Sequence, residues 1–241
     1  MNRDDFNDKF ILCLNDNKLN EYTGLGDKMY ALTEMLLECN AHMNLTAITD
    51  PGDTIAKHLA DSLKICRYIP TGATLLDVGA GAGFPSLPIA IARPDVTITA
   101  LDSTMKKLTY IDAAAVAIGL ANISTLNARA ECAAHQSAFR ERFDVVTARA
   151  VARLNVLCEL CLPYTAVGGK FIAMKGAGAF SETEEALTAI RILGGTMTEN
   201  IMDDLVVFGD RQKRCAIIIQ KNRQTPKNYP RDFSRITKKP L

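Results

Sequence analysis

Residues 74–86 of the chain read TLLDVGAGAGFPS, and this stretch decides the fold. An apolar run ends in an acid, three glycines follow at alternate positions, and a proline comes two residues after the last of them. The run 74–78 has the length and composition of a buried strand, and Pro85 suits the first turn of a helix. Glycine permits positive φ angles and leaves room for a ligand beside the backbone. The stretch therefore predicts a strand, a ligand-facing loop and a helix, at the carboxyl edge of a parallel sheet.

The glycine loop can be compared with three classes of nucleotide-binding loop. A phosphate-binding loop ends in Gly-Lys-Ser/Thr, whereas this one ends in Gly83-Phe84-Pro85, which excludes that class. A dinucleotide-binding loop has the form G-x-G-x-x-G, and neither register of the glycines supplies its third glycine. The form D-V-G-x-G-x-G resembles instead the first motif of the S-adenosylmethionine-dependent methyltransferases. Gly79, Gly81 and Gly83 are therefore expected to contact S-adenosyl-L-methionine.

A second acid supports a nucleoside cofactor. The run 96–101 predicts the next strand, and Asp102 follows it, 23 residues after Gly79. A carboxylate at this position can accept hydrogen bonds from both hydroxyls of a ribose. The alternative is a structural role, because Asp102 or Ser103 would also cap a helix that begins near Thr104. The loop and the acid together favour a nucleoside cofactor, and their form argues against a nicotinamide dinucleotide.

The rest of the chain predicts an α/β fold with a Rossmann-like, mostly parallel sheet. Further strands are predicted at 122–126, 143–148, 169–174 and 214–220, with helices between most of them, such as 104–118 and 153–165. Alternating strands and helices indicate a parallel sheet that is covered on both faces. Residues 196–220 contain strands with no helix between them, which predicts an antiparallel hairpin at one edge.

Three segments are expected along the chain. Residues 1–70 predict an N-terminal helical region packed on the sheet, with a cap at Asp50 and a first helical position at Pro51. Its apolar stripe comprises Leu25, Met29, Leu32, Leu36 and Met43. Residues 71–220 predict the methyltransferase domain. Residues 221–241 predict a basic C-terminal tail that is either extended or disordered.

Charge and cysteine usage limit the choice of partners and cofactors. From Arg211 onwards there are ten Lys or Arg and one acid, although the whole chain has a net charge of only +1. A basic end on an acidic body favours a polyanionic partner, and a merely solvated end is the alternative. Seven scattered cysteines indicate reduced thiols, and Cys158 and Cys161 are expected to pack in the core rather than bind a metal. With no apolar run near the ~18 residues of a membrane span and no signal peptide pattern, we expect a cytoplasmic protein.

Longer strings carry a more specific resemblance. They include MNLTAITDP (43–51), IAKHLADSL (55–63), LLDVGAGAGFPSLPIAI (75–91), FDVVTARAVA (143–152), FIAMKG (171–176) and TPKNYPR (225–231). Collinear from about residue 40 to the end, they resemble the RsmG family, also called glucose-inhibited division protein B. The resemblance implies methylation of N7 of one guanine in the decoding region of 16S rRNA, with small-subunit rRNA or the ribosomal subunit as partner. One position departs from the family, which usually has glycine after Phe-Pro where this chain has Ser86.

The resemblance also implies site residues. Cofactor contacts would fall on Gly79, Phe84, the Ala130-Glu131 pair and Arg149. Guanine N7 has a lone pair and no proton, so no general base is expected and no catalytic residue is assigned.

Three side chains are candidates for positioning the substrate. Arg149 and Lys175 stand at predicted strand ends, and because isolated cations are costly to bury, both are expected to face a ligand. His58 shares a helix face with Asp61 and Ser62, either at the mouth of the pocket or as a structural cluster that holds the helices on the sheet.

Two other functions fit parts of the sequence. One is a different cofactor enzyme, either a small-molecule methyltransferase or a dinucleotide oxidoreductase. The basic tail disfavours the first and the glycine loop the second. The other is a non-catalytic ribosome-binding module on a Rossmann scaffold, which the intact glycine loop and Asp102 disfavour. No long heptad pattern is present, so a monomer is expected.

Overall fold

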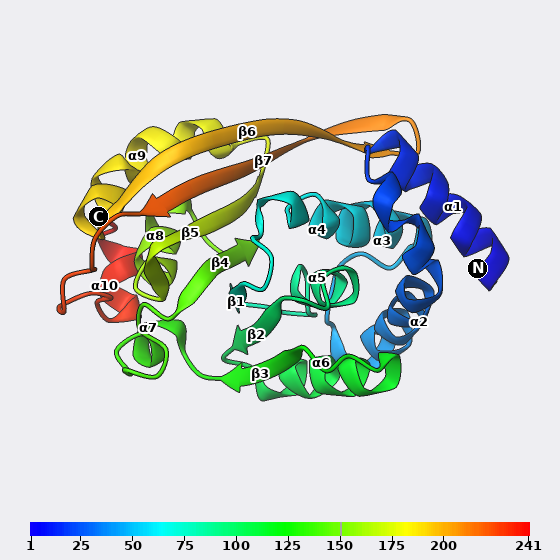
Figure 1. Cartoon of the computed structure of the whole chain (residues 1–241), viewed down its shortest axis with the longest axis horizontal. Coiled ribbons are helices and arrows are strands. Elements are labelled where there is room, and N and C mark those ends of the chain that lie inside the picture. Colours follow the sequence, from blue (N-terminus) through cyan, green and yellow to red (C-terminus); the bar gives the residue numbers. More distant parts are fainter. Residues whose placement is uncertain (150) are drawn as a thin grey trace.

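The computed structural model describes residues 1–149 and 151–241, with the side chain of Phe180 left aside. A single mixed sheet has helices packed on both of its faces (Figure 1). Its strands are β1 Thr74–Val78, β2 Thr97–Asp102, β3 Ile123–Asn127, β4 Phe143–Arg149, β5 Thr165–Gly176, β6 Gly195–Val207 and β7 Asp210–Lys221. They lie in the order β3-β2-β1-β4-β5-β7-β6. The first five run parallel, and β7 and β6 form an antiparallel hairpin at one edge. The predicted fold class is confirmed.

The helices surround the sheet in chain order. The α-helices are α1 Arg3–Asp16, α2 Gly26–Met43, α3 Pro51–Thr54, α4 Asp61–Leu63, α5 Ser86–Ala92, α6 Met105–Ile118, α7 Ala130–Ala133, α8 Leu154–Cys161, α9 Ala179–Ile192 and α10 Phe233–Lys238. Two short 3₁₀ helices, η1 Asn20–Leu25 and η3 Cys66–Tyr68, and one π-helix, η2 Ile55–Ala60, complete the N-terminal part.

The hydrophobic core lies in two layers, one on each face of the sheet. Along β1, Leu75 belongs to the layer that the N-terminal helices, α5 and α6 cover, and Leu76 to the layer under α8 and α9. Neighbouring strand residues point to opposite faces, so both layers depend on the same short apolar run. The tail contributes to the second layer through Ile236, which is fully buried.

The N-terminal helices begin and pack as their sequence predicts. Asp50 caps α3 by accepting a hydrogen bond from the amide of Asp53 at 2.8 Å, and Pro51 is the first helical residue. The π-helix η2 then runs directly into α4. At the other side of this region, the side-chain amide of Asn17 pairs with the backbone of Val206 through two hydrogen bonds of 2.9 Å, which fastens the end of α1 to β6.

Local boundaries differ from expectation in three places. The helix expected at 153–165 ends at Cys161, because the chain turns at Pro163 and enters β5 at Thr165. The helix after the glycine loop begins at Ser86, with Pro85 as its N-cap residue. The tail is not uniformly extended, since its last part forms α10. The division into segments 1–70, 71–220 and 221–241 stays a prediction.

Candidate active site

The glycine loop crosses the carboxyl end of β1 with all three glycines at positive φ, 75° at Gly79, 58° at Gly81 and 83° at Gly83. A Cβ atom at Gly79 would lie 2.8 Å from Cγ2 of Val151, and one at Gly83 would lie 2.5 Å from Cδ1 of Leu87. At Gly81 the nearest atom to a Cβ would be a backbone oxygen 3.9 Å away, so this residue faces open space. The loop needs glycine twice for packing, and at the third it leaves the backbone open to a ligand.

Asp102 lies at the end of β2 and holds this loop. Its Oδ2 accepts a hydrogen bond from the amide of Gly81 at 3.0 Å, and its Oδ1 accepts one from the amide of Thr104 at 2.8 Å. The second contact is the capping role that the sequence left open. Each carboxylate oxygen can accept a further hydrogen bond, so the capacity to bind two ribose hydroxyls remains.

Asp77, the acid before the glycines, lies completely inside the protein. The hydroxyl of Ser86 donates to its Oδ2, and the hydroxyl of Thr147 donates to its Oδ1 at 3.2 Å. Burial raises the pKa of Asp77 to about 6, and the two hydroxyls oppose that rise. Ser86, the position that departs from the family, therefore ties the start of α5 to the strand beneath the loop.

The variant Ser86→Ala is expected to lower the free energy of unfolding by about 1–3 kcal/mol, because Asp77 then loses a donor where water does not replace it. Urea denaturation measures the change, with Ser137→Ala, at an exposed position, as the control. An unchanged midpoint for Ser86→Ala would show that Asp77 does not depend on this hydroxyl.

A cavity of about 510 Å³ opens above the loop and Asp102, and we name it the cofactor cleft. Among the residues that line it are Gly79, Gly81, Phe84, Asp102, Ala130, Glu131 and Arg149. These are the predicted cofactor residues except Gly83, which packs against Leu87 behind the loop.

Several other residues that line the cofactor cleft were not predicted. They include Thr46, Lys107, Arg129, Val151 and Phe233. Val151 and Lys107 follow predicted strand ends and could have been found from that position. Phe233 lies in the tail, and no spacing in the sequence relates it to the loop.

One wall of the cofactor cleft is made by three stacked side chains. The rings of His58 and Phe84 lie 4.4 Å apart at 13°, and the guanidinium of Arg149 lies 5.6 Å from the Phe84 ring. Arg149 also donates to Nδ1 of His58 at 2.9 Å and to the carbonyl oxygen of Lys57 at 2.9 Å. The Lys57 carbonyl belongs to the π-helix η2, so this irregular turn directs a backbone acceptor at the site.

His58 is a neutral imidazole with both nitrogens engaged. Because arginine can only donate, Nδ1 is the acceptor, and Nε2 carries the proton and donates to the hydroxyl of Thr46 at 2.9 Å. Burial, with a smaller contribution from Arg149, lowers the pKa of His58 to about 3. The residue is therefore fixed as a spacer between the α3–α4 segment and the sheet, and it is unsuited to removing a proton.

This pKa predicts how His58 affects stability as the pH changes. The folded state keeps His58 neutral down to about pH 3, whereas the unfolded chain binds a proton below about pH 6.5. Its contribution to stability is present above pH 6.5 and is lost as the pH falls. The unfolding free energy of the wild type minus that of His58→Gln is expected to fall by about 2 kcal/mol between pH 7 and pH 5.

Denaturation of both proteins at pH 5, 6 and 7 checks this difference. Asp77 has the opposite dependence, because its raised pKa favours the folded state at low pH, and it is present in both proteins. Its contribution therefore cancels in the comparison. A difference that stays constant with pH would mean that His58 is protonated in the folded state.

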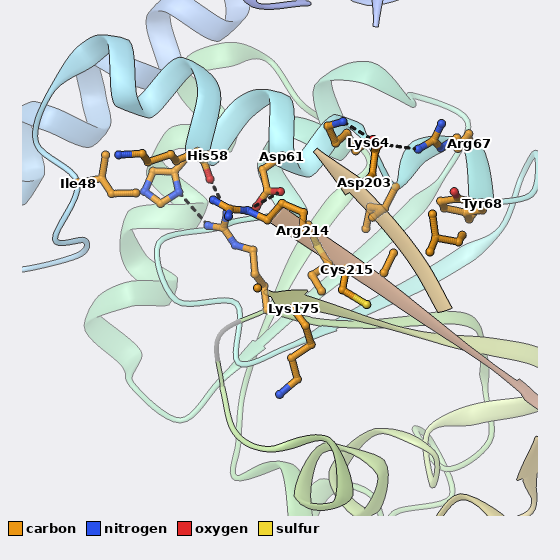
Figure 2. Close-up of a pocket in the computed structure, with 17 residues that line it drawn as sticks. Ile48, His58, Asp61, Lys64, Arg67, Tyr68, Lys175, Asp203, Arg214 and Cys215 are labelled. Carbon is orange, nitrogen blue, oxygen red and sulfur yellow. Dashed lines mark hydrogen bonds and ion pairs between the residues drawn. The ribbon is translucent and has the colours of Figure 1, made fainter. Parts of the chain in front are cut away.

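A second cavity of about 360 Å³ adjoins the first and shares His58 and Arg149 with it. Figure 2 shows it between the segment that carries His58, Asp61 and Lys64 on one side and strands of the β5–β7–β6 sheet edge on the other. Asp61 lies 3.4 Å from a nitrogen of Arg149 and 3.3 Å from Nε of Arg214. Burial raises the pKa of Asp61, and the two guanidiniums oppose that rise.

Lys175 is placed differently from the sequence expectation. Its ammonium donates to the carbonyl oxygen of Ala152 at 2.5 Å and to Oε2 of Glu182 at 2.7 Å. Figure 2 shows this ammonium pointing away from the His58–Arg149–Asp61 group. The cation is buried, but an acid from α9 accompanies it, so the argument from an isolated charge does not apply.

The cysteines and the charged groups do not form a metal centre in the part of the chain that is described. Cys158 and Cys161 are fully buried, and burial raises the pKa of both thiols, as the predicted core role requires. No three His, Cys, Asp or Glu side chains of the described residues gather as metal ligands. None of the described helices is long and apolar enough to cross a membrane.

Solved structures with a similar fold are methyltransferases of several kinds. The 16S rRNA (adenine(1408)-N(1))-methyltransferase from Catenulisporales acidiphilia has a TM-score of 0.53 and 13% identity, over 68% of this chain and 93% of that one. The ribosomal protein L11 methylase from Lactobacillus delbrueckii has a TM-score of 0.52 and 14% identity, over 69% of this chain and 80% of that one. At these identities the likeness establishes the fold alone.

Sequence relatives are much closer. The ribosomal RNA small subunit methyltransferase G of Exiguobacterium sibiricum is 44% identical over 210 residues, covering 86% of this chain and 87% of that one. The protein of the same name from Oceanobacillus iheyensis is 40% identical over 236 residues, covering 97% of this chain and 98% of that one. The family model GidB, described as rRNA small subunit methyltransferase G, matches residues 26–202. With the glycine loop, Asp102 and Arg149 assembled around one cleft, the chain belongs to the GidB family of rRNA small subunit methyltransferases.

Proposed function

We propose that this protein transfers the methyl group of S-adenosyl-L-methionine to N7 of one guanine in the decoding region of 16S rRNA. The observation that carries the proposal is the pair of adjoining cavities with a shared His58–Arg149 wall. One cavity has the glycine loop and Asp102 expected for the cofactor, and the other has charged and apolar walls suited to a nucleotide. Two reactants held in neighbouring cavities meet without a bimolecular search.

The residues of the cofactor cleft fit S-adenosyl-L-methionine. The open backbone at Gly81 accepts a ligand without a clash, and Asp102 retains acceptor capacity for the ribose. Arg149 would pair with the carboxylate of the methionine portion, and the Ala130–Glu131 turn would border the adenine. The bound cofactor supplies a methyl group on a positively charged sulfur.

The second cavity would receive the target guanine. Ile48, Tyr68 and Met174 give it apolar surface for a flat base, and Arg214 and Lys57 stand ready for phosphate oxygens. The carboxylate of Asp61 can accept hydrogen bonds from N1–H and the amino group of guanine, a pairing that adenine does not offer. A base that enters such a pocket must leave its stack, which costs least in a single-stranded loop.

The chain then has only to orient the reactants. Guanine N7 attacks with its own lone pair and has no proton to lose, so no general base is required. This agrees with His58, which is neutral and has both nitrogens occupied. Arg149 holds the wall between the cavities, and exclusion of water completes the protein's contribution.

The partner in this proposal is small-subunit rRNA or the ribosomal subunit, and the protein acts as a monomer in the cytoplasm. Methyl transfer from labelled S-adenosyl-L-methionine to small subunits of a strain that lacks the gene tests the proposal. Mass spectrometry of the nucleosides is expected to give 7-methylguanosine at one position. Cofactor binding without label in the RNA would favour a small-molecule substrate, and RNA binding without cofactor binding would favour a non-catalytic ribosome-binding module.

A further inference from the structure

The residues after β7, which we name the C-terminal strap (222–241), are fastened to the methyltransferase sheet by specific contacts. Arg140 donates to the carbonyl oxygens of Thr225 at 2.8 Å and of Tyr229 at 2.9 Å. Arg231 donates from two side-chain nitrogens to the fully buried carboxylate of Glu159, at 2.8 and 2.6 Å. The strap therefore follows a fixed path across the α7–β4 connection and α8.

This path brings α10 to the cofactor cleft. Ile236 anchors the helix in the core, and Phe233, its first residue, lines the cleft while remaining 39% exposed. Figure 1 shows α10 beside α7 and α8. The guanidinium of Arg129 lies 4.9 Å from the centre of the Phe233 ring, and its Nε donates to Glu131 at 2.6 Å. A continuous set of contacts thus joins the strap to the Ala130–Glu131 end of the cleft.

The outer side of the strap carries unpaired positive charge. Lys227, Arg235, Lys238 and Lys239 are exposed, and none of them forms an ion pair with another described residue. Asp232 is the one acid of the strap. Because Lys221 and Arg231 are already engaged by Glu141 and Glu159, the polyanion-binding capacity of the chain end lies in these four exposed cations.

We propose that the C-terminal strap is an RNA-docking surface that also forms a wall of the cofactor cleft, so that RNA on its cations and cofactor against Phe233 strengthen each other's binding. The proposal rests on the proposed function for the identity of the two ligands. A helix of six residues has little stability of its own, so its position depends on what it contacts on either side. Any ligand that holds it from one side favours the ligand on the other, and this coupling is reciprocal.

The test measures the Kd of S-adenosyl-L-homocysteine, which carries no transferable methyl group, for the full-length protein with and without saturating unmethylated small subunits. For the wild type, the RNA is expected to lower this Kd about fivefold or more. Phe233→Ala is expected to raise the Kd about tenfold without RNA and to abolish the effect of RNA. Phe233→Tyr keeps the ring and should behave as the wild type.

A second variant separates the charges from the ring. The triple variant Arg235→Gln, Lys238→Gln, Lys239→Gln should bind S-adenosyl-L-homocysteine normally without RNA, lose the effect of RNA, and reduce the salt slope of RNA binding by about 2–3. Its matched control removes three exposed lysines of the N-terminal part, Lys9, Lys18 and Lys28. Equal loss of coupling in this control would overturn the assignment to the strap.

The outcomes distinguish this inference from the proposed function. If the wild type binds neither S-adenosyl-L-homocysteine nor small subunits, the proposed function fails. If the wild type binds both and the Kd does not respond to RNA, or if Phe233→Ala keeps the wild-type response, only the coupling through the strap fails. Thermal denaturation of each variant checks folding, which is expected to be normal because the altered side chains are partly or fully exposed.

Discussion

Arg149→Met will lose methyl-transfer activity by about 100-fold or more, and its free energy of unfolding will fall by about 3–5 kcal/mol. In the wild type, the guanidinium of Arg149 donates to Nδ1 of His58 and the carbonyl oxygen of Lys57, and it neutralises Asp61. Methionine fills similar volume but leaves the buried carboxylate with Arg214 alone, and it releases the wall between the cavities. Urea denaturation and the methyl-transfer assay measure the two effects independently.

Two further variants show whether the loss has this cause. Arg153→Met removes an arginine whose partner, Glu185, is half exposed, and it should change stability by less than about 1 kcal/mol. Adding Asp61→Asn to Arg149→Met removes the unpaired charge, so it should restore part of the stability and none of the activity. If Arg149→Met is as stable as the wild type, Asp61 does not depend on this arginine.

Asp102→Ala will weaken binding of S-adenosyl-L-methionine by about 10- to 100-fold and leave RNA binding intact. The carboxylate holds the loop through the amide of Gly81 and keeps acceptor capacity for a ribose, and alanine provides neither. Because both contacts form in the bound state as well as during the reaction, turnover at saturating cofactor should largely recover. Isothermal titration and steady-state kinetics over a range of cofactor concentrations measure this.

Asp112→Ala is the matched control, since Asp112 is an exposed acid on the neighbouring helix α6 that bonds only to Thr125 among the described residues. It should leave cofactor affinity unchanged. Wild-type cofactor affinity in Asp102→Ala would remove Asp102 from the site. Loss of RNA binding together with cofactor binding would mean that the loop, and not only the ribose contact, had collapsed.

The sequence predicted those parts of the site that are close in the chain or repeat a period. The loop after β1 and the acid after β2 occupy the ends of neighbouring parallel strands, and that relation follows from topology once the strands are recognised. Residues joined only by tertiary packing were missed. Phe233 reaches the cleft because Arg231 and Ile236 set the path of the strap, and no local pattern encodes that path.

Two individual side chains illustrate why residue type alone is insufficient. Lys175 was expected to face a ligand because a buried lone cation is costly, yet Glu182 from α9 supplies its counter-charge. Ser86 was expected to matter little, yet it is one of two hydroxyls bound to the buried Asp77. In both cases the deciding partner lies on another element, whose distance in space the sequence does not give.

The pairing of Asn17 with Val206 has a consequence for synthesis of the protein. The two residues are 189 positions apart, and the second cavity is closed by the same β6–β7 hairpin that Asn17 holds. During translation the parallel strands that carry the glycine loop and Asp102 emerge long before this hairpin, and contacts between such distant residues form slowly. A nascent chain can therefore complete its nucleoside-binding half early, but it gains the pocket for its nucleic acid only when the last strands have left the ribosome.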